Sequence, residues 1–157
     1  MPNSMQKIQH FFVYGTLCRG QCRERLWPAR PIRVVPAWTT GHLYGREDYP
    51  AMRPGADRVL GECWEFEASE MPLVIRTLDE IEGTNQPGEA NLYDRVITQA
   101  YFVAGPETTI PAFGYHYAIN PIADGFHRIL PADAETGVRW PHVGPASAPG
   151  PRFGTSR

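Results

Sequence analysis

The strongest constraint on the fold is the stretch 11–20, where an apolar run stops at a glycine. Its aromatic and β-branched residues are typical of a buried strand. Gly15 allows a sharp turn and the close approach of a ligand. We expect the polar residues 21–26 to form a short helix after it. Free N–H groups would then gather at one point, which suits a carboxylate. An ordinary connecting loop explains the same residues.

Composition narrows the class of protein. A chain of 157 residues, 42% hydrophobic and 20% charged, fits one globular domain. The net charge of -2 gives no basic field for nucleic acid. The 15 glycines and 16 prolines indicate many turns rather than a helical bundle. We see neither a signal peptide nor a membrane span, and so expect no membrane partner.

The cysteines and histidines argue against disulfides and metal. Cys18, Cys22 and Cys63 are odd in number and fit no disulfide framework. Reduced thiols in the cytoplasm are therefore the expectation. No histidine pairs with another ligand at a metal-binding spacing, so no metal is predicted.

Periodicity predicts four further strands after the first one. They are a strand at 32–45 that is interrupted by Pro36, followed by strands at 59–66, 93–103 and 109–118. Residues 46–55 are expected to form a loop. With the two helices, these strands predict an α+β domain with a mostly antiparallel sheet or barrel.

The longer helix is predicted over 69–82. Ser69 is a candidate N-cap, and Val74, Leu78 and Ile81 share one face. Gly83 should end the helix.

The regular patterns fade after Asn120. We therefore divide the chain into a flexible N-terminus (1–8), one domain (9–141) and a Gly/Pro-rich tail (142–157).

Glu82 is the most suggestive acid, because it ends this helix beside the core-facing Ile81. A helix carboxyl end carries partial negative charge, and burial disfavours a carboxylate further. Both effects raise a carboxyl pKa toward the range that is useful for proton transfer. A solvated glutamate at a helix end is the alternative.

Six short motifs follow one another with sensible gaps. They are Tyr14-Gly15-Thr16-Leu17, Gly41-His42-Leu43-Tyr44, Tyr49-Pro50-Ala51, Val59-Leu60-Gly61-Glu62, Leu78-Asp79-Glu80-Ile81-Glu82-Gly83 and Tyr93-Asp94-Arg95. In this order they resemble the γ-glutamylcyclotransferase-like (AIG2-like) family over residues 9–118. The resemblance implies a small mixed β-barrel with flanking helices.

The resemblance also implies roles for particular residues. Glu82 matches the acid/base of the Asp-x-x-Glu-Gly motif, with Asp79 one turn earlier and off the reacting position. The predicted substrate-binding residues are Tyr14, Gly15, Thr16 and Leu17 of the loop, with Tyr49, Tyr93 and Arg95 from the other motifs. We call residues 14–17 the glycine turn.

The resulting hypothesis is an enzyme that cyclises a γ-glutamyl group to 5-oxoproline and releases an amine or amino acid. It would need no cofactor, and its partner would be a small γ-glutamyl compound. A non-catalytic binding or interaction module of the same fold is the alternative. The leaving amine and the oligomeric state stay open at this point.

Overall fold

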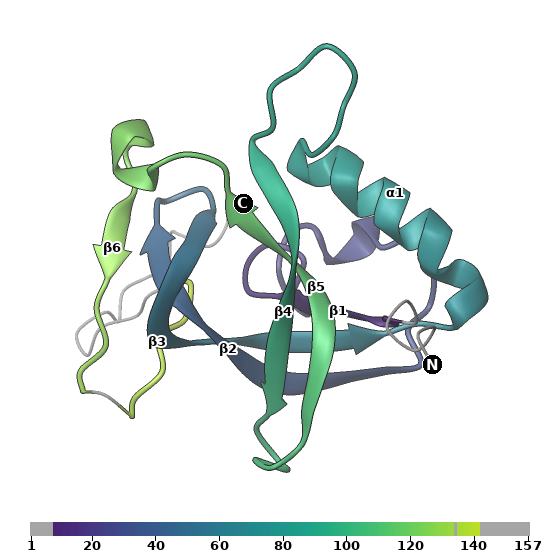
Figure 1. The fold of residues 1–157 in the computed structure, drawn as a ribbon, viewed down its shortest axis with the longest axis horizontal. Helices are drawn as coiled ribbons and strands as arrows, with labels where there is room; N and C mark the ends of the chain where they lie inside the picture. The colour runs from purple at the N-terminus through teal and green to yellow at the C-terminus, as the bar shows by residue number, and fades with distance from the viewer. Residues whose placement is uncertain (1–7, 134, 142–157) are drawn as a thin grey trace.

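The computed structural model describes residues 8–133 and 135–141 and forms a small β-barrel with one α-helix packed beside it (Figure 1). The strands are β1 (His10–Val13), β2 (Arg33–Gly45), β3 (Pro50–Glu65), β4 (Tyr93–Phe102), β5 (Thr109–Tyr117) and β6 (His127–Ile129). The helix is α1 (Met71–Glu82), and three 3-10 turns are η2 (Glu24–Leu26), η3 (Ala68–Glu70) and η4 (Pro121–Asp124). No helix in this part of the chain is long and apolar enough to cross a membrane.

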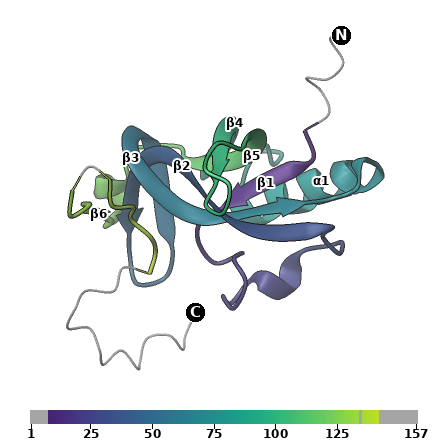
Figure 2. The ribbon, with the colours of Figure 1, turned by 90° about the horizontal axis from the view of Figure 1, so that it is seen from below.

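The barrel closes through five strands in the order β3-β1-β5-β4-β2, with β2 pairing back onto β3. Only β1 and β5 are parallel neighbours, and the other pairs are antiparallel. The sixth strand, β6, adds to the end of β2. It lies at the opposite end of the molecule from α1 (Figures 1 and 2). The predicted α+β fold with a mixed, mostly antiparallel barrel is confirmed.

Strand β1 is buried along its whole length, as its sequence predicts. Phe12 and the following Tyr14 pack with one core cluster, which includes Leu43, Met52 and Val59. Phe11 and Val13 belong to a second cluster that includes the buried face of α1. Side chains alternate across a strand, so one apolar run serves both clusters.

Helix α1 buries Met71, Val74 and Leu78 against this second cluster. It ends as predicted at Gly83, which has a φ of 66° in the left-handed region. The Gly83 N–H donates to carbonyls of the last helical turn. The helix end thus places Glu82 at a fixed point beside the barrel.

Two helix predictions need correction. The prediction of a helix over 21–26 is wrong, because only the 3-10 turn η2 forms there. The chain instead folds back, and the Arg23 N–H donates to the Thr16 carbonyl at 2.8 Å. Ser69 is not an N-cap, since it lies inside η3 and α1 has no side-chain cap.

The predicted loop at 46–55 is wrong from Pro50 onward, where β3 begins. Ala51 and Met52 are fully buried and pair with β2, so the apolar content of this segment stabilises a strand. Pro36 does not break β2, which runs on through it. Beyond Asn120, η4 and β6 add structure that the sequence pattern did not indicate.

The predicted tail at 142–157 and most of the predicted flexible N-terminus lie outside the described residues. The described residues include residue 8, which is the last of that N-terminal segment. They also include the whole predicted domain except residue 134.

Gly61→Ala should destabilise the barrel by about 2 kcal/mol or more. A Cβ at this position would overlap the Val13 carbonyl oxygen and lie 2.8 Å from Cζ of Phe12, so β1 and β3 would have to separate. Gly114→Ala is the matched control, because its Cβ would meet no atom nearer than 3.6 Å. Urea unfolding of both variants checks this, and equal losses would contradict the packing described.

Candidate active site

A cavity opens where β1, the carboxyl end of α1 and the start of β3 meet. Its walls come from residues 12–17, 49–50, 81–82 and 92–93, together with Arg23 and Tyr115. It offers about 120 Å³, well above the roughly 10–15 Å³ that one water needs. All predicted site residues except Arg95 line this cavity.

The glycine turn forms one wall and carries unused donors. Within the described residues, the N–H groups of Thr16 and Leu17 donate to no backbone or side-chain acceptor, whereas the Gly15 N–H faces the Cys18 sulfur. The turn itself is held by a Cys18 N–H bond to the Gly15 carbonyl at 3.0 Å. Two free N–H groups on a short loop can receive a carboxylate or an oxyanion.

Gly15 is needed for a reason that the sequence did not reveal. A Cβ there would lie 2.6 Å from Cγ of Pro50, inside contact distance. Its φ is not in the left-handed region. The glycine therefore allows the turn to pack against the start of β3, and this contact brings two walls of the cavity together.

Glu82 lines the same cavity from the end of α1. Burial raises its pKa from the usual 4.5 to about 7, and the positive charge of Arg23 opposes this rise. The residue is only partly buried, because the cavity is open to solvent on one side. In the described part of the chain, no group donates a hydrogen bond to its carboxylate. Such a carboxyl can take up and release a proton at neutral pH.

Three tyrosines build the walls with their hydroxyl groups already engaged. Tyr14 donates to the Tyr115 carbonyl at 2.7 Å, and Tyr93 donates to the Pro50 carbonyl at 2.7 Å. Tyr115 donates to Asp79 Oδ1 at 2.6 Å. Burial raises the pKa of all three hydroxyls. Their aromatic faces therefore shape the cavity, and they keep their protons.

Arg95 lies outside the cavity, contrary to its predicted contact with substrate. Its Nε donates to Asp79 Oδ1 at 3.0 Å, and its guanidinium lies over the Phe113 ring. Asp79 is 7% exposed and also accepts the Tyr115 hydroxyl. Asp79 is thus a structural acid that joins α1 to β4 and β5, and its replacement would disturb the wall of the cavity.

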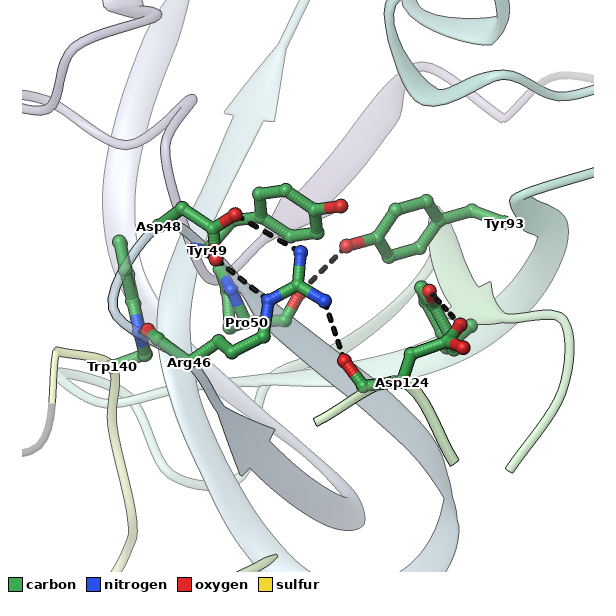
Figure 3. Close-up of polar contacts among 8 residues, drawn as sticks. Arg46, Asp48, Tyr49, Pro50, Tyr93, Asp124 and Trp140 are labelled. Atoms are coloured by element: carbon green, nitrogen blue, oxygen red, sulfur yellow. Dashed lines mark hydrogen bonds and ion pairs between the residues drawn. The ribbon is translucent and has the colours of Figure 1, made fainter. Parts of the chain in front are cut away.

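Arg46 fastens the wall that carries Tyr49 (Figure 3). Its guanidinium donates to both carboxylate oxygens of Asp48, at 2.8 and 3.0 Å, and to the Asp124 carbonyl at 2.6 Å. It also lies 4.7 Å from the Tyr49 ring centroid and 4.3 Å from that of Phe126. One side chain thus joins the connection between β2 and β3 to η4.

Arg23 is the functional candidate that sequence reasoning missed. Arg23 belongs to the segment 21–26, which was predicted to form a helix after the turn. The bond from its N–H to the Thr16 carbonyl instead holds it beside the glycine turn, where it lines the cavity. The only sequence signal was a basic residue shortly after the turn, and the chain has many of those.

In the described part of the chain no cysteine lines the cavity, and Cys18, which follows the glycine turn, is not a nucleophile. The Cys18 thiol lies 3.6 Å from the Val13 carbonyl oxygen, and burial raises its pKa. A thiol of this kind stays protonated and unreactive. In residues 8–133 and 135–141, no three His, Cys, Asp or Glu side chains converge on a metal-sized space.

Arg46→Lys should reduce the free energy of unfolding by about 1–3 kcal/mol. Lysine keeps the charge but cannot reach Asp48 with two parallel bonds or stack between the two rings. Arg76→Lys, exposed on α1, should change stability by less than about 0.5 kcal/mol. Denaturant titration measures both, and an Arg46→Lys protein as stable as the parent would contradict the role described.

A titration of Glu82 should give a pKa of about 7 by carboxyl NMR. Because this value lies above 4.5, the ionised carboxylate destabilises the folded state, and stability present below pH 4.5 is lost as pH rises through 7. Glu82→Gln should therefore gain stability over the parent across this window, and Glu80→Gln, an exposed neighbour, should not. A pH-independent difference would place the Glu82 carboxyl in solvent.

Comparisons with known proteins agree with the fold and identify the family. Residues 11–134 match the family described as gamma-glutamyl cyclotransferase, AIG2-like. The crystal structure of an AIG2-like protein from Mus musculus superposes with a TM-score of 0.57 at 25% identity, covering 82% of this chain and 90% of that one.

A second structure, YkqA from Bacillus subtilis, gives a TM-score of 0.54 at 20% identity. The match covers 77% of this chain and 37% of that longer one, and it shows the shared fold. None of the curated proteins compared matches significantly. The family match spans most of the chain, and the chain therefore belongs to the AIG2-like gamma-glutamyl cyclotransferase family.

Proposed function

We propose that this protein cyclises the γ-glutamyl group of a small substrate to 5-oxoproline and releases an amine or amino acid. The observation that carries the proposal is the content of the cavity. A carboxyl with a pKa of about 7 and a loop with two free N–H groups line the same small space. The α-ammonium of a γ-glutamyl group can give a proton to this carboxyl, and its α-carboxylate can accept hydrogen bonds from these N–H groups.

In this mechanism the glycine turn holds the α-carboxylate, and Glu82 accepts a proton from the α-ammonium. The free amine attacks the γ-carbonyl carbon of the same molecule, and a five-membered ring forms as the C–N bond closes. Glu82 then gives its proton to the departing nitrogen as the original amide bond breaks. The ring nitrogen still carries a second proton, which also passes through Glu82 to the departing amine. The amine therefore leaves as an ammonium, the ring nitrogen keeps one hydrogen, and the Glu82 carboxylate is regenerated.

The reaction suits a site with so few polar groups. Nucleophile and electrophile belong to one molecule, so the walls mainly need to hold the substrate in a folded shape. Aromatic faces of Tyr14, Tyr93 and Tyr115 provide such walls. Their hydroxyl groups are bound to protein acceptors, which leaves Glu82 to carry the proton.

We also propose a cytoplasmic location, on the number and spacing of the cysteines. The alternative function, a binding module of the same fold without turnover, would require no proton carrier. Release of 5-oxoproline from a panel of γ-glutamyl compounds separates the two.

Glu82→Gln should lower turnover by roughly 10²–10⁴-fold. Glutamine keeps the shape of the side chain but cannot carry a proton at neutral pH. Substrate affinity should change much less, because the glycine turn holds the carboxylate. Steady-state release of 5-oxoproline, with calorimetric binding at equilibrium, measures both quantities.

Glu80→Gln is the control for this experiment. Glu80 is exposed two residues earlier on α1, so its loss of charge should leave turnover nearly unchanged. If Glu82→Gln released 5-oxoproline at close to the parent rate, the acid/base role of Glu82 would be refuted.

A further inference from the structure

Arg23 is the one basic residue among those that line the cavity, and the proposed reaction does not use it. Four other arginines of the described chain pair with acids, namely Arg33, Arg46, Arg95 and Arg128. Arg23 has no acidic partner in the described part of the chain. The segments outside it contain no Asp or Glu. Among the described residues, the cavity thus holds a cation with no carboxylate at ion-pair distance, and its one acid, Glu82, interacts with that cation only at longer range.

A backbone hydrogen bond holds Arg23 beside the glycine turn. The Arg23 N–H donates to the Thr16 carbonyl at 2.8 Å, which ties Arg23 to the glycine turn. In a trans peptide the C=O and the following N–H point in opposite directions, so Arg23 and the Leu17 N–H lie on opposite sides of this peptide. The main chain of Arg23 therefore lies across this peptide from the Leu17 N–H, and Arg23 lines the cavity beside the turn.

The charge of Arg23 also reaches the reacting acid. The positive charge of Arg23 favours the ionised form of Glu82 and so lowers the pKa of that carboxyl. A partly buried guanidinium among aromatic walls is stabilised by an anion, and its planar fork matches a carboxylate with two parallel bonds. The site is therefore suited to a substrate that brings a carboxylate near Glu82.

A γ-glutamyl substrate has one α-carboxylate, and the free N–H groups of the glycine turn already accommodate it. Arg23, the unused cation of the same cavity, then fits a second carboxylate. We propose that Arg23 binds the carboxylate of the leaving group, so that the protein prefers γ-glutamyl amino acids to γ-glutamyl amines. This inference rests on the proposed function and adds the class of leaving group.

The test compares two substrates that differ only in the second carboxylate, γ-glutamyl-alanine and γ-glutamyl-ethylamide. The parent protein should have the higher kcat/KM for the alanine compound. Arg23→Gln should lower kcat/KM for that compound by roughly 10–100-fold and change the ethylamide value little, because it removes a charge-assisted pair. Arg23→Lys should restore part of the difference.

Arg25→Gln is the matched control, since Arg25 is exposed in η2 and does not line the cavity. It should leave the ratio of the two substrates unchanged. Any general effect of Arg23 on the Glu82 pKa acts on both substrates and cancels in this ratio. An Arg23→Gln protein that loses equal activity on both would overturn the proposal, because its role would then concern Glu82 or the α-carboxylate.

If neither the parent protein nor any of these variants releases 5-oxoproline, the proposed function itself is refuted. Calorimetric binding of the same two compounds then decides the role of Arg23 alone. Tighter binding of γ-glutamyl-alanine by the parent, lost in Arg23→Gln, would support the carboxylate site. Equal affinities, or no binding of either compound, would overturn it.

Discussion

Strand β1 is buried on both faces, and the position of the site depends on that burial. Its side chains are shared between the barrel cluster and the cluster under α1, so the strand cannot shift without opening both. The chain leaves β1 at a glycine that packs directly against Pro50. The glycine turn is therefore held at a fixed place between β3 and the end of α1. A ligand that binds its N–H groups meets donors that are already oriented, which is the condition for electrostatic stabilisation at low cost in reorganisation.

The electrostatics of the cavity follow from the same packing. The cavity has aromatic walls around one acid, Glu82, and one cation, Arg23. The hydroxyl groups of its wall tyrosines donate to protein acceptors, except that of Tyr49. Burial pushes the pKa of Glu82 upward, and Arg23 holds it near 7 rather than higher. Arg46 acts at a distance from this chemistry. It fixes the segment that carries Tyr49 by binding Asp48 and the η4 backbone at once (Figure 3).

The sequence predicted the parts of this account that depend on local patterns. Each of these patterns can be read from a short stretch of sequence: the apolar run of β1, the amphipathic face of α1 and the end of the helix at Gly83. Together they place Glu82 at a helix end. The parts that depend on distant contacts were not visible. Pro50 starts a strand because β2 pairs with it, Arg95 turns away because Asp79 lies opposite, and Arg23 enters the cavity through one backbone bond. None of these partners is adjacent in sequence to the residue that it controls.

In the proposed mechanism the glycine turn and Glu82 form one site for a γ-glutamyl group. A crystal structure of the protein with the product 5-oxoproline tests it most directly. We expect the product carboxylate at hydrogen-bonding distance, roughly 2.7–3.1 Å, from the N–H groups of Thr16 and Leu17, with the ring nitrogen facing the Glu82 carboxyl. A product bound outside this cavity, or bound there with its carboxylate on Arg23 and its ring turned away from Glu82, would contradict the account.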